Sequence, residues 1–181
     1  MHIYPIAAYP WGGAYQPRAE ASIGRTEGEL CVRMTAWEPS IIAHEMCFGG
    51  PVCRDSCLEF FFQPARETDA RYINIEVNPI GTMHIGIGEG RHGRQVLTER
   101  PPLIAPTVQI EVGKCWSVSY QLPFTWIASL FPSFDPGEPI RLWGNFYACD
   151  ESIHPHFGCA FPIESENPDF HRPEWFQEIL L

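Results

Sequence analysis

Hydrophobic and polar residues alternate along short stretches of this chain, and prolines and glycines separate the stretches. Strict alternation with period two is the signature of a strand that buries one face. About eight stretches show it: 18–25, 30–37, 54–63, 71–78, 82–88, 107–112, 115–122 and 139–149. One short helix is predicted over 124–130, after a proline, with a last turn over 173–179. The pattern predicts one all-β domain over residues 1–181, an antiparallel β-sandwich with one or two short helices.

The alternation also divides each strand into an inward and an outward face. The inward sets are apolar: Leu58, Phe60 and Phe62; Ile73, Ile75 and Val77; Met83, Ile85 and Ile87; Ile140, Leu142, Phe146 and Ala148; Leu30, Val32, Met34 and Ala36. For the hairpin over 71–88 we expect Glu76 opposite Thr82, Asn74 opposite His84, and Tyr72 opposite Gly86. The outward face of this hairpin is then polar, with a hollow at its glycines.

Charge and length narrow the possible partners. The 181 residues include 22 acidic and 12 basic side chains, a formal net charge of −10, which argues against nucleic acid. No apolar run approaches the ~20 residues of a membrane span. The first residues lack the features of a secretion signal, so we expect a cytoplasmic protein, or an extracellular one if the sequence is trimmed. Seven cysteines, an odd number, favour reduced thiols. The oligomeric state stays open.

Aromatic residues make up 13% of the chain, with six tryptophans, and several fall on the outward face beside amides, carboxylates and arginines. A neutral, hydroxyl-rich ligand requires this combination, because a sugar ring packs its C–H face on an aromatic ring and hydrogen-bonds through its hydroxyls. The candidate ligand-binding residues are Trp143, Asn145, Tyr147, Arg141, Glu59, Glu76, Asn74 and, on a loop, Arg91. Alternatively, the loops 38–53 and 90–106 cover this face, which then forms a second core or an interaction surface.

Several segments, in this order, carry a family resemblance. They are 55–61 (Asp-Ser-Cys-Leu-Glu-Phe-Phe), 72–78 (Tyr-Ile-Asn-Ile-Glu-Val-Asn), 80–82 (Ile-Gly-Thr) and a closing 168–174 (Pro-Asp-Phe-His-Arg-Pro-Glu). Together they resemble the family 9 carbohydrate-binding modules and, more broadly, the DOMON-like sugar- and haem-binding sandwiches. The resemblance implies an antiparallel sandwich that binds glucan or xylan chain ends, or small sugars, in carbohydrate catabolism. Some relatives also hold a structural calcium ion.

The family clamps a sugar ring between two tryptophans and binds its hydroxyls with Glu, Gln, Asn and Arg. The motif glutamate falls on Glu59, a polar residue of the next strand on Glu76, where the family pattern leads us to expect arginine, and an amide on Asn145. Tryptophan candidates, by chemistry only, are Trp143, Trp37 and Trp175.

Other chemistries remain alternatives. Glu59 and Glu76 share a face and could meet the carboxylate spacing of a glycoside hydrolase, although binding without catalysis is our interpretation. Two groups of possible metal ligands fit loop roles better than zinc sites: His44, Cys47, Cys53 and Cys57, and His154, His156, Cys159 and His171. Haem is excluded because Met83 and His84, as neighbours in a strand, point to opposite faces. We expect no metal or other cofactor beyond the possible calcium.

Overall fold

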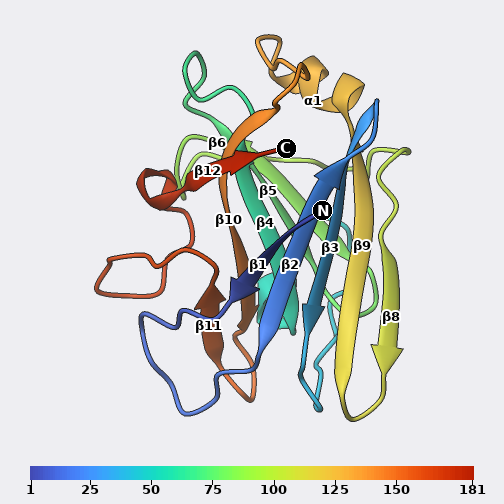
Figure 1. Ribbon diagram of the computed structural model, residues 1–181. Helices are drawn as coiled ribbons and strands as arrows, with labels where there is room; N and C mark the ends of the chain where they lie inside the picture. Colours follow the sequence, from blue (N-terminus) through green and yellow to red (C-terminus); the bar gives the residue numbers. More distant parts are fainter.

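Two antiparallel sheets pack face to face in the computed structural model, which describes residues 1–181 (Figure 1). The first sheet has the order β1 (His2–Ile6), β2 (Ala19–Arg25), β3 (Glu29–Ala36), β9 (Cys115–Pro123), β8 (Thr107–Glu111). The second has the order β11 (His156–Cys159), β10 (Arg141–Asp150), β4 (Cys57–Gln63), β5 (Tyr72–Val77), β6 (Met83–Gly88), β7 (Gln95–Val96), and β12 (Gln177–Leu180) also pairs with β10. The predicted all-β sandwich is confirmed.

Helical structure is sparse. The single α-helix, α1 (Phe124–Leu130), has the predicted bounds and lies at one end of the sandwich (Figure 1). Two 3₁₀ turns, η1 (Val52–Arg54) and η2 (Pro173–Trp175), complete the list of helical elements. None of these helices has the length or apolar character to span a membrane.

The inward faces meet in a core of 31 buried residues between the two sheets. All the apolar sets that alternation assigned to the inside belong to this core, so the predicted strand faces are confirmed. Its centre is a stack of three phenylalanines: Phe60 lies 4.6 Å from Phe62 and 4.5 Å from Phe146, centroid to centroid. The outward faces of β4, β5 and β10 are therefore fixed in direction, and these strands carry the site described below.

The hairpin of β5 and β6 pairs differently from the prediction. Glu76 lies opposite His84, Asn74 opposite Gly86, and Tyr72 opposite Gly88, two residues further along β6 than expected. The turn is wider because the side-chain oxygen of Asn78 accepts hydrogen bonds from the backbone N–H groups of residues 80 and 82. A shift of two residues keeps every side chain on its face, so the register was wrong while the faces were right.

Four short strands were missed: β1, β7, β11 and β12. Each has two to five residues, and each lies at a sheet margin, where alternation is too brief to be seen. The predicted last turn over 173–179 divides into η2 and the strand β12. β11 and β12 extend the second sheet along the same side of β10, one at each end.

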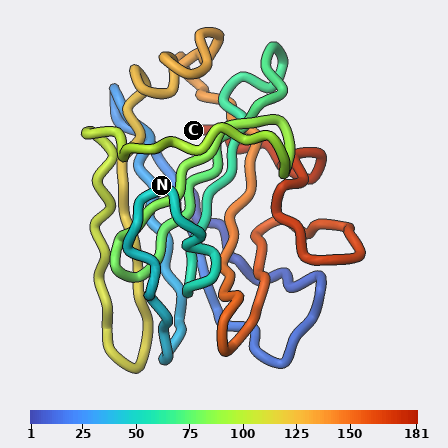
Figure 2. The backbone as a smooth tube through the Cα atoms, turned by 180° about the vertical axis from the view of Figure 1, so that it is seen from behind, coloured from blue at the N-terminus to red at the C-terminus, as the bar shows by residue number.

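A second hydrophobic cluster, of ten buried residues, covers part of the outer face of the second sheet. The residues that pack onto this face come mainly from the segment 160–176 and from the loop after β1, and both segments lie beside this sheet (Figure 2). Both loops expected to cover this face do so in part: 38–53 contributes Val52 and Cys53 to the cluster, and 90–106 contributes the Arg94 side chain, which lies over the Tyr72 ring. The outer face is thus closed in one region and open in another.

Candidate ligand-binding pocket

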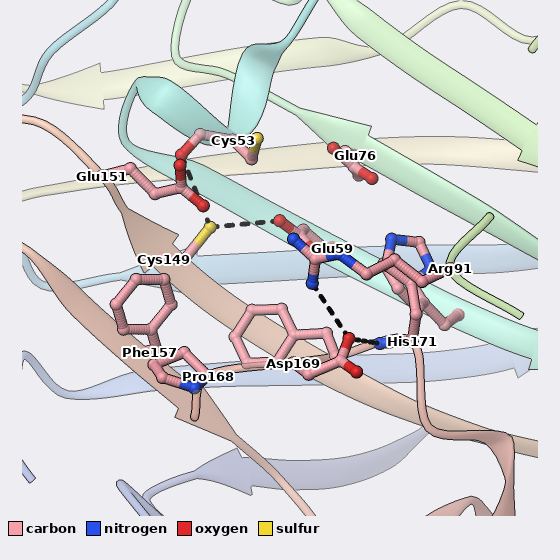
Figure 3. A pocket seen from close by; sticks show the side chains of 12 residues that line it. Cys53, Glu59, Glu76, Arg91, Cys149, Glu151, Phe157, Pro168, Asp169 and His171 are labelled. Carbon is pink, nitrogen blue, oxygen red and sulfur yellow. Dashed lines mark hydrogen bonds and ion pairs between the residues drawn. The ribbon is translucent and has the colours of Figure 1, made fainter. Parts of the chain in front are cut away.

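The open region of this face is a pocket between the second sheet and residues 168–171 (Figure 3). Its cavity volume is about 90 Å³, below the range of about 300–1,000 Å³ that is typical of small-molecule sites, so a bound sugar would reach out through its open mouth. Its lining residues are Cys53, Glu59, Phe61, Glu76, Arg91, Cys149, Glu151, Phe157, Pro168, Asp169, Phe170 and His171.

Three of the predicted binding residues, Glu59, Glu76 and Arg91, line the pocket. Glu59 of β4 lies directly opposite Glu76 of β5, so the two carboxyl groups stand side by side on one wall. Both are almost fully buried, with 2% and 7% of the residue exposed. Arg91 arrives on the loop between β6 and β7 and donates a 3.0 Å hydrogen bond to Asp169 (Figure 3).

Burial and the neighbouring carboxylate of Glu76 raise the pKa of Glu59 well above its ordinary value. Burial also raises the pKa of Glu76, but there His84, Asn74 and Arg94 counteract it by stabilising the charged form. Glu59 therefore holds a proton more firmly than Glu76. The pair offers a donor and an acceptor side by side, which suits two adjacent hydroxyl groups.

Asn74 supports Glu76 from behind. Its amide nitrogen donates a 2.8 Å hydrogen bond to Glu76 Oε1, and its oxygen accepts hydrogen bonds of 2.5 and 3.0 Å from Arg94. Asn74 is completely buried and does not line the pocket. The structure thus places this predicted binding residue where it orients another one.

The hollow expected at Gly86 and Gly88 is filled by the chain itself. The Arg94 guanidinium lies 4.0 Å from the centroid of the Tyr72 ring and donates to the backbone oxygens of residues 72, 86, 88 and 90. The glycines make room for this packing, since a Cβ atom at Gly86 would lie 2.5 Å from the side-chain oxygen of Asn74. At both glycines the space that a side chain would occupy is thus taken by Asn74 and Arg94.

Asn145 and Tyr147 hold the segment 160–176 against the outer face of the second sheet. Both are completely buried. Asn145 exchanges hydrogen bonds with the backbone of Phe161, of 2.8 and 3.0 Å. The Tyr147 ring stacks on Phe170 at 4.1 Å, and its hydroxyl donates to the Phe170 carbonyl. Neither side chain reaches the pocket surface, because the segment 160–176 lies on top of them.

Trp143 and Arg141 lie at the other end of β10, beside a separate hollow formed with residues 64–68. Arg66 covers the Trp143 ring at 4.3 Å, and Arg141 pairs with Glu178. The remaining tryptophan candidates are also outside the pocket: Trp37 carries Arg18 on its ring at 4.0 Å, and Trp175 packs against the second hydrophobic cluster. Of the eight predicted ligand-binding residues, three line the pocket, three are buried without reaching it, and two lie at the other end of β10.

Several pocket residues were not identified from the sequence as ligand-binding, among them Cys149, Glu151, Phe157, Asp169 and Phe170. His171 was considered only as a metal ligand. Its Nδ1 lies 2.7 Å from the Tyr72 hydroxyl, which leaves Nε2 as its free nitrogen. Burial and the nearby Arg94 lower the pKa of His171 to about 3, so the ring is neutral. The closing motif 168–174 was the available signal for the residues at 169–171.

Side chains that could bind a metal ion come together at one place in the structure. Neither of the two groups of cysteines and histidines considered from the sequence forms a cluster, and the only cluster of three or more His, Cys, Asp or Glu ligand atoms consists of Cys57, Glu59 and Cys149. This donor set does not fit the calcium ion that some relatives hold, because calcium takes six to eight oxygen ligands. All seven cysteines are free thiols.

Comparison with known proteins gives one family. The sequence profile of carbohydrate-binding family 9 matches residues 2–181. No protein of curated function matches the chain. A crystal structure from Bacteroides uniformis ATCC 8492, named provisionally as a carbohydrate-binding protein, is 26% identical and has a TM-score of 0.86; the match covers 99% of this chain and 86% of that one.

Two further structures are family 9 carbohydrate-binding modules from Caldicellulosiruptor kristjanssonii. One, in complex with glucose, is 10% identical with a TM-score of 0.68, covering 99% of this chain and 83% of that one. The other, in complex with cellotriose, is 10% identical with a TM-score of 0.62, covering 93% and 77%. At this identity the likeness shows a common fold.

Proposed function

The chain belongs to carbohydrate-binding family 9, as its motifs predicted, and from this we propose that it binds a saccharide in the pocket beside Glu59 and Glu76. The observation that carries the proposal is a pair of buried carboxyl groups facing a cavity with phenylalanine side chains in its wall. The structural neighbours in complex with glucose and cellotriose support this class of ligand. A link to carbohydrate catabolism is part of the proposal and rests on the family alone.

The chemistry of the lining matches a sugar ring. Phe157 and Phe170 supply apolar surface for the C–H face of the ring, while Glu59 and Glu76 hydrogen-bond adjacent hydroxyls. Arg91 and Asp169, joined at the pocket, can exchange their mutual hydrogen bond for bonds to the sugar, in which Arg91 donates to a sugar oxygen and Asp169 accepts from a hydroxyl group. Because the segment 168–171 covers one side, we expect a chain end or a free monosaccharide rather than the middle of a polysaccharide.

Calorimetric titration with glucose, xylose and their β-1,4-linked oligomers tests the proposal. Glu76→Gln and Phe157→Ala should each weaken binding at least tenfold, because each removes a contact made in the pocket. Trp11 provides a second readout, since its ring lies 6.3 Å from Phe157 and 5.9 Å from Phe170, so ligand entry should change its fluorescence.

The matched control is Trp143→Ala, an aromatic truncation on the same sheet but at the separate hollow. We expect it to leave binding unchanged. If Trp143→Ala abolishes binding and Phe157→Ala does not, the site lies at the other end of β10. If no saccharide of the panel binds to the wild-type protein, the proposed function is wrong.

A glycoside hydrolase that uses Glu59 and Glu76 is the alternative activity. A hydrolase needs its two carboxyl groups on opposite sides of the scissile bond. Here both rise from directly opposed positions of neighbouring strands and stand on one wall. This arrangement favours binding, and we expect no release of chromophore from aryl glycosides; release that Glu59→Gln abolishes would establish the hydrolase instead.

A further inference from the structure

Two thiols and one carboxyl group converge beside the pocket, and the sheet register brings them together. Cys57 and Glu59 are two residues apart on β4, so their side chains share the outer face. Cys149 of β10 lies directly opposite Cys57. The two sulfur atoms and a carboxylate oxygen all lie within 4.8 Å of one another, and Cys149 Sγ is 3.1 Å from Glu59 Oε1 (Figure 3).

We propose that Cys57, Cys149 and Glu59 form a binding site for a thiophilic divalent cation of the zinc class, with a fourth coordination position open to the pocket. Zinc prefers thiolate, imidazole and carboxylate ligands in a tetrahedron, with bonds of about 2.0–2.3 Å. Ligand atoms on such a tetrahedron are separated by about 3–4 Å. The cluster therefore needs only small side-chain rotations to close around one ion.

The surroundings favour a cation at this point. Glu76 lies opposite Glu59, and Glu151 also lines the pocket, so several carboxyl groups face the site. The nearest arginine of the lining, Arg91, already pairs with Asp169. A bound cation would add a positive charge among these carboxyl groups.

Burial and access suit a metal site as well. Cys57, Glu59 and Cys149 are each no more than 2% exposed, which keeps the ligands in fixed positions. Glu59 and Cys149 nevertheless line the pocket, so an ion can enter from solvent. Three protein ligands and one open position are the arrangement in which zinc also binds water or a ligand oxygen. The inference does not depend on the saccharide proposal, although both use Glu59.

Cobalt(II) is the probe for this site, because thiolate-to-cobalt charge transfer absorbs in the near ultraviolet, whereas imidazole and carboxylate ligands give no such band. The reduced wild-type protein, in oxygen-free buffer, should bind one equivalent with this band and with the visible spectrum of a tetrahedral ion. Zinc should displace the cobalt and raise the melting temperature. Protons must leave the thiols, so affinity should fall as the pH is lowered.

Variants identify the ligands. Cys57→Val and Cys149→Ala should each lose the two-thiolate spectrum, and Glu59→Gln should keep the charge-transfer band while losing at least tenfold in affinity. Cys115→Ser is the matched control, since this thiol lies on β9 of the other sheet and should leave the spectrum unchanged.

Circular dichroism of each apoprotein must first show the wild-type fold; Glu59→Gln, which keeps both thiols, supplies the test if a cysteine variant does not fold. The proposal is overturned if the reduced wild-type protein gives no charge-transfer band, or if the folded cysteine variants keep the band at its full two-thiolate intensity. A wild-type protein that binds cobalt but no saccharide would refute the proposed function alone.

Discussion

Replacing Arg94 tests how the polar part of the outer face is held together. Arg94→Met keeps most of the aliphatic stem but removes the guanidinium that donates to Asn74 Oδ1 and to backbone oxygens of residues 72, 86, 88 and 90. A buried acceptor without a donor costs about 1–3 kcal/mol, and hydrogen bonds from a charged donor contribute about 1.5–3 kcal/mol each. Asn74 is completely buried, whereas Arg94 is only half-buried and water can reach some of the carbonyl groups.

We therefore expect Arg94→Met to lower the free energy of unfolding by about 2–4 kcal/mol, well below the sum of the individual bonds. At about 2–4 °C per kcal/mol for a chain of this length, the melting temperature falls by about 4–16 °C. Saccharide affinity should fall as well, because Asn74 loses the partner that orients it toward Glu76.

Urea denaturation with a linear extrapolation measures the loss, provided that the slope of the two proteins agrees. Arg18→Met is the matched control: its ion pair with Glu20 is exposed, so its removal should cost less than about 1 kcal/mol. A loss below about 0.5 kcal/mol for Arg94→Met would refute the reasoning, since it would mean that water replaces the guanidinium at every acceptor.

Three further predictions concern other parts of the second sheet. Burial lowers the pKa of His156, but Glu38 Oε1, 3.0 Å from its Nε2, and other partners more than offset this and raise the pKa above its ordinary value of 6.5. The stability that protonated His156 contributes should therefore be complete below pH 6.5 and decline as the pH rises through the folded-state pKa. Glu38→Gln should remove this decline from the pH profile of the unfolding free energy. Tyr147→Phe keeps the ring stack but loses one hydrogen bond to the closing segment, so denaturation should show a loss of about 1 kcal/mol; no loss would mean that the hydroxyl contributes nothing. Gly86→Ala places a methyl group 2.5 Å from Asn74 Oδ1 and should cost about 1–3 kcal/mol in the same assay, whereas an unchanged midpoint would show that Asn74 moves freely.

The sequence predicted the sandwich and the face of each long strand because both follow from a local rule. Side chains in a strand alternate, so Phe60 and Glu59 must point to opposite sides whatever the rest of the chain does. The register of the β5–β6 hairpin escaped prediction because it depends on how the Asn78 side chain widens the turn. The short edge strands escaped because two to five residues carry too little periodicity.

The same division applies to the candidate site. Alternation placed Glu59 and Glu76 on one outward face of neighbouring strands, and the register of β4 and β5, which the structure supplied, set them directly opposite each other. The sequence could not determine which outward residues stay open to a ligand. Tyr147 is closed off by Phe170, and Tyr72 meets His171, through contacts between segments 23 and 99 residues apart.

Only the tertiary structure decided those contacts, because covering a sheet face depends on where a distant segment folds back and not on any local pattern. The segment 160–176, anchored by Asn145 and Tyr147, covers the aromatic part of the outer face around Tyr147. It leaves the part around Glu59 and Glu76 open as a pocket. The sequence determined which side chains point outward, and the path of residues 160–176 determined which of them a ligand can reach.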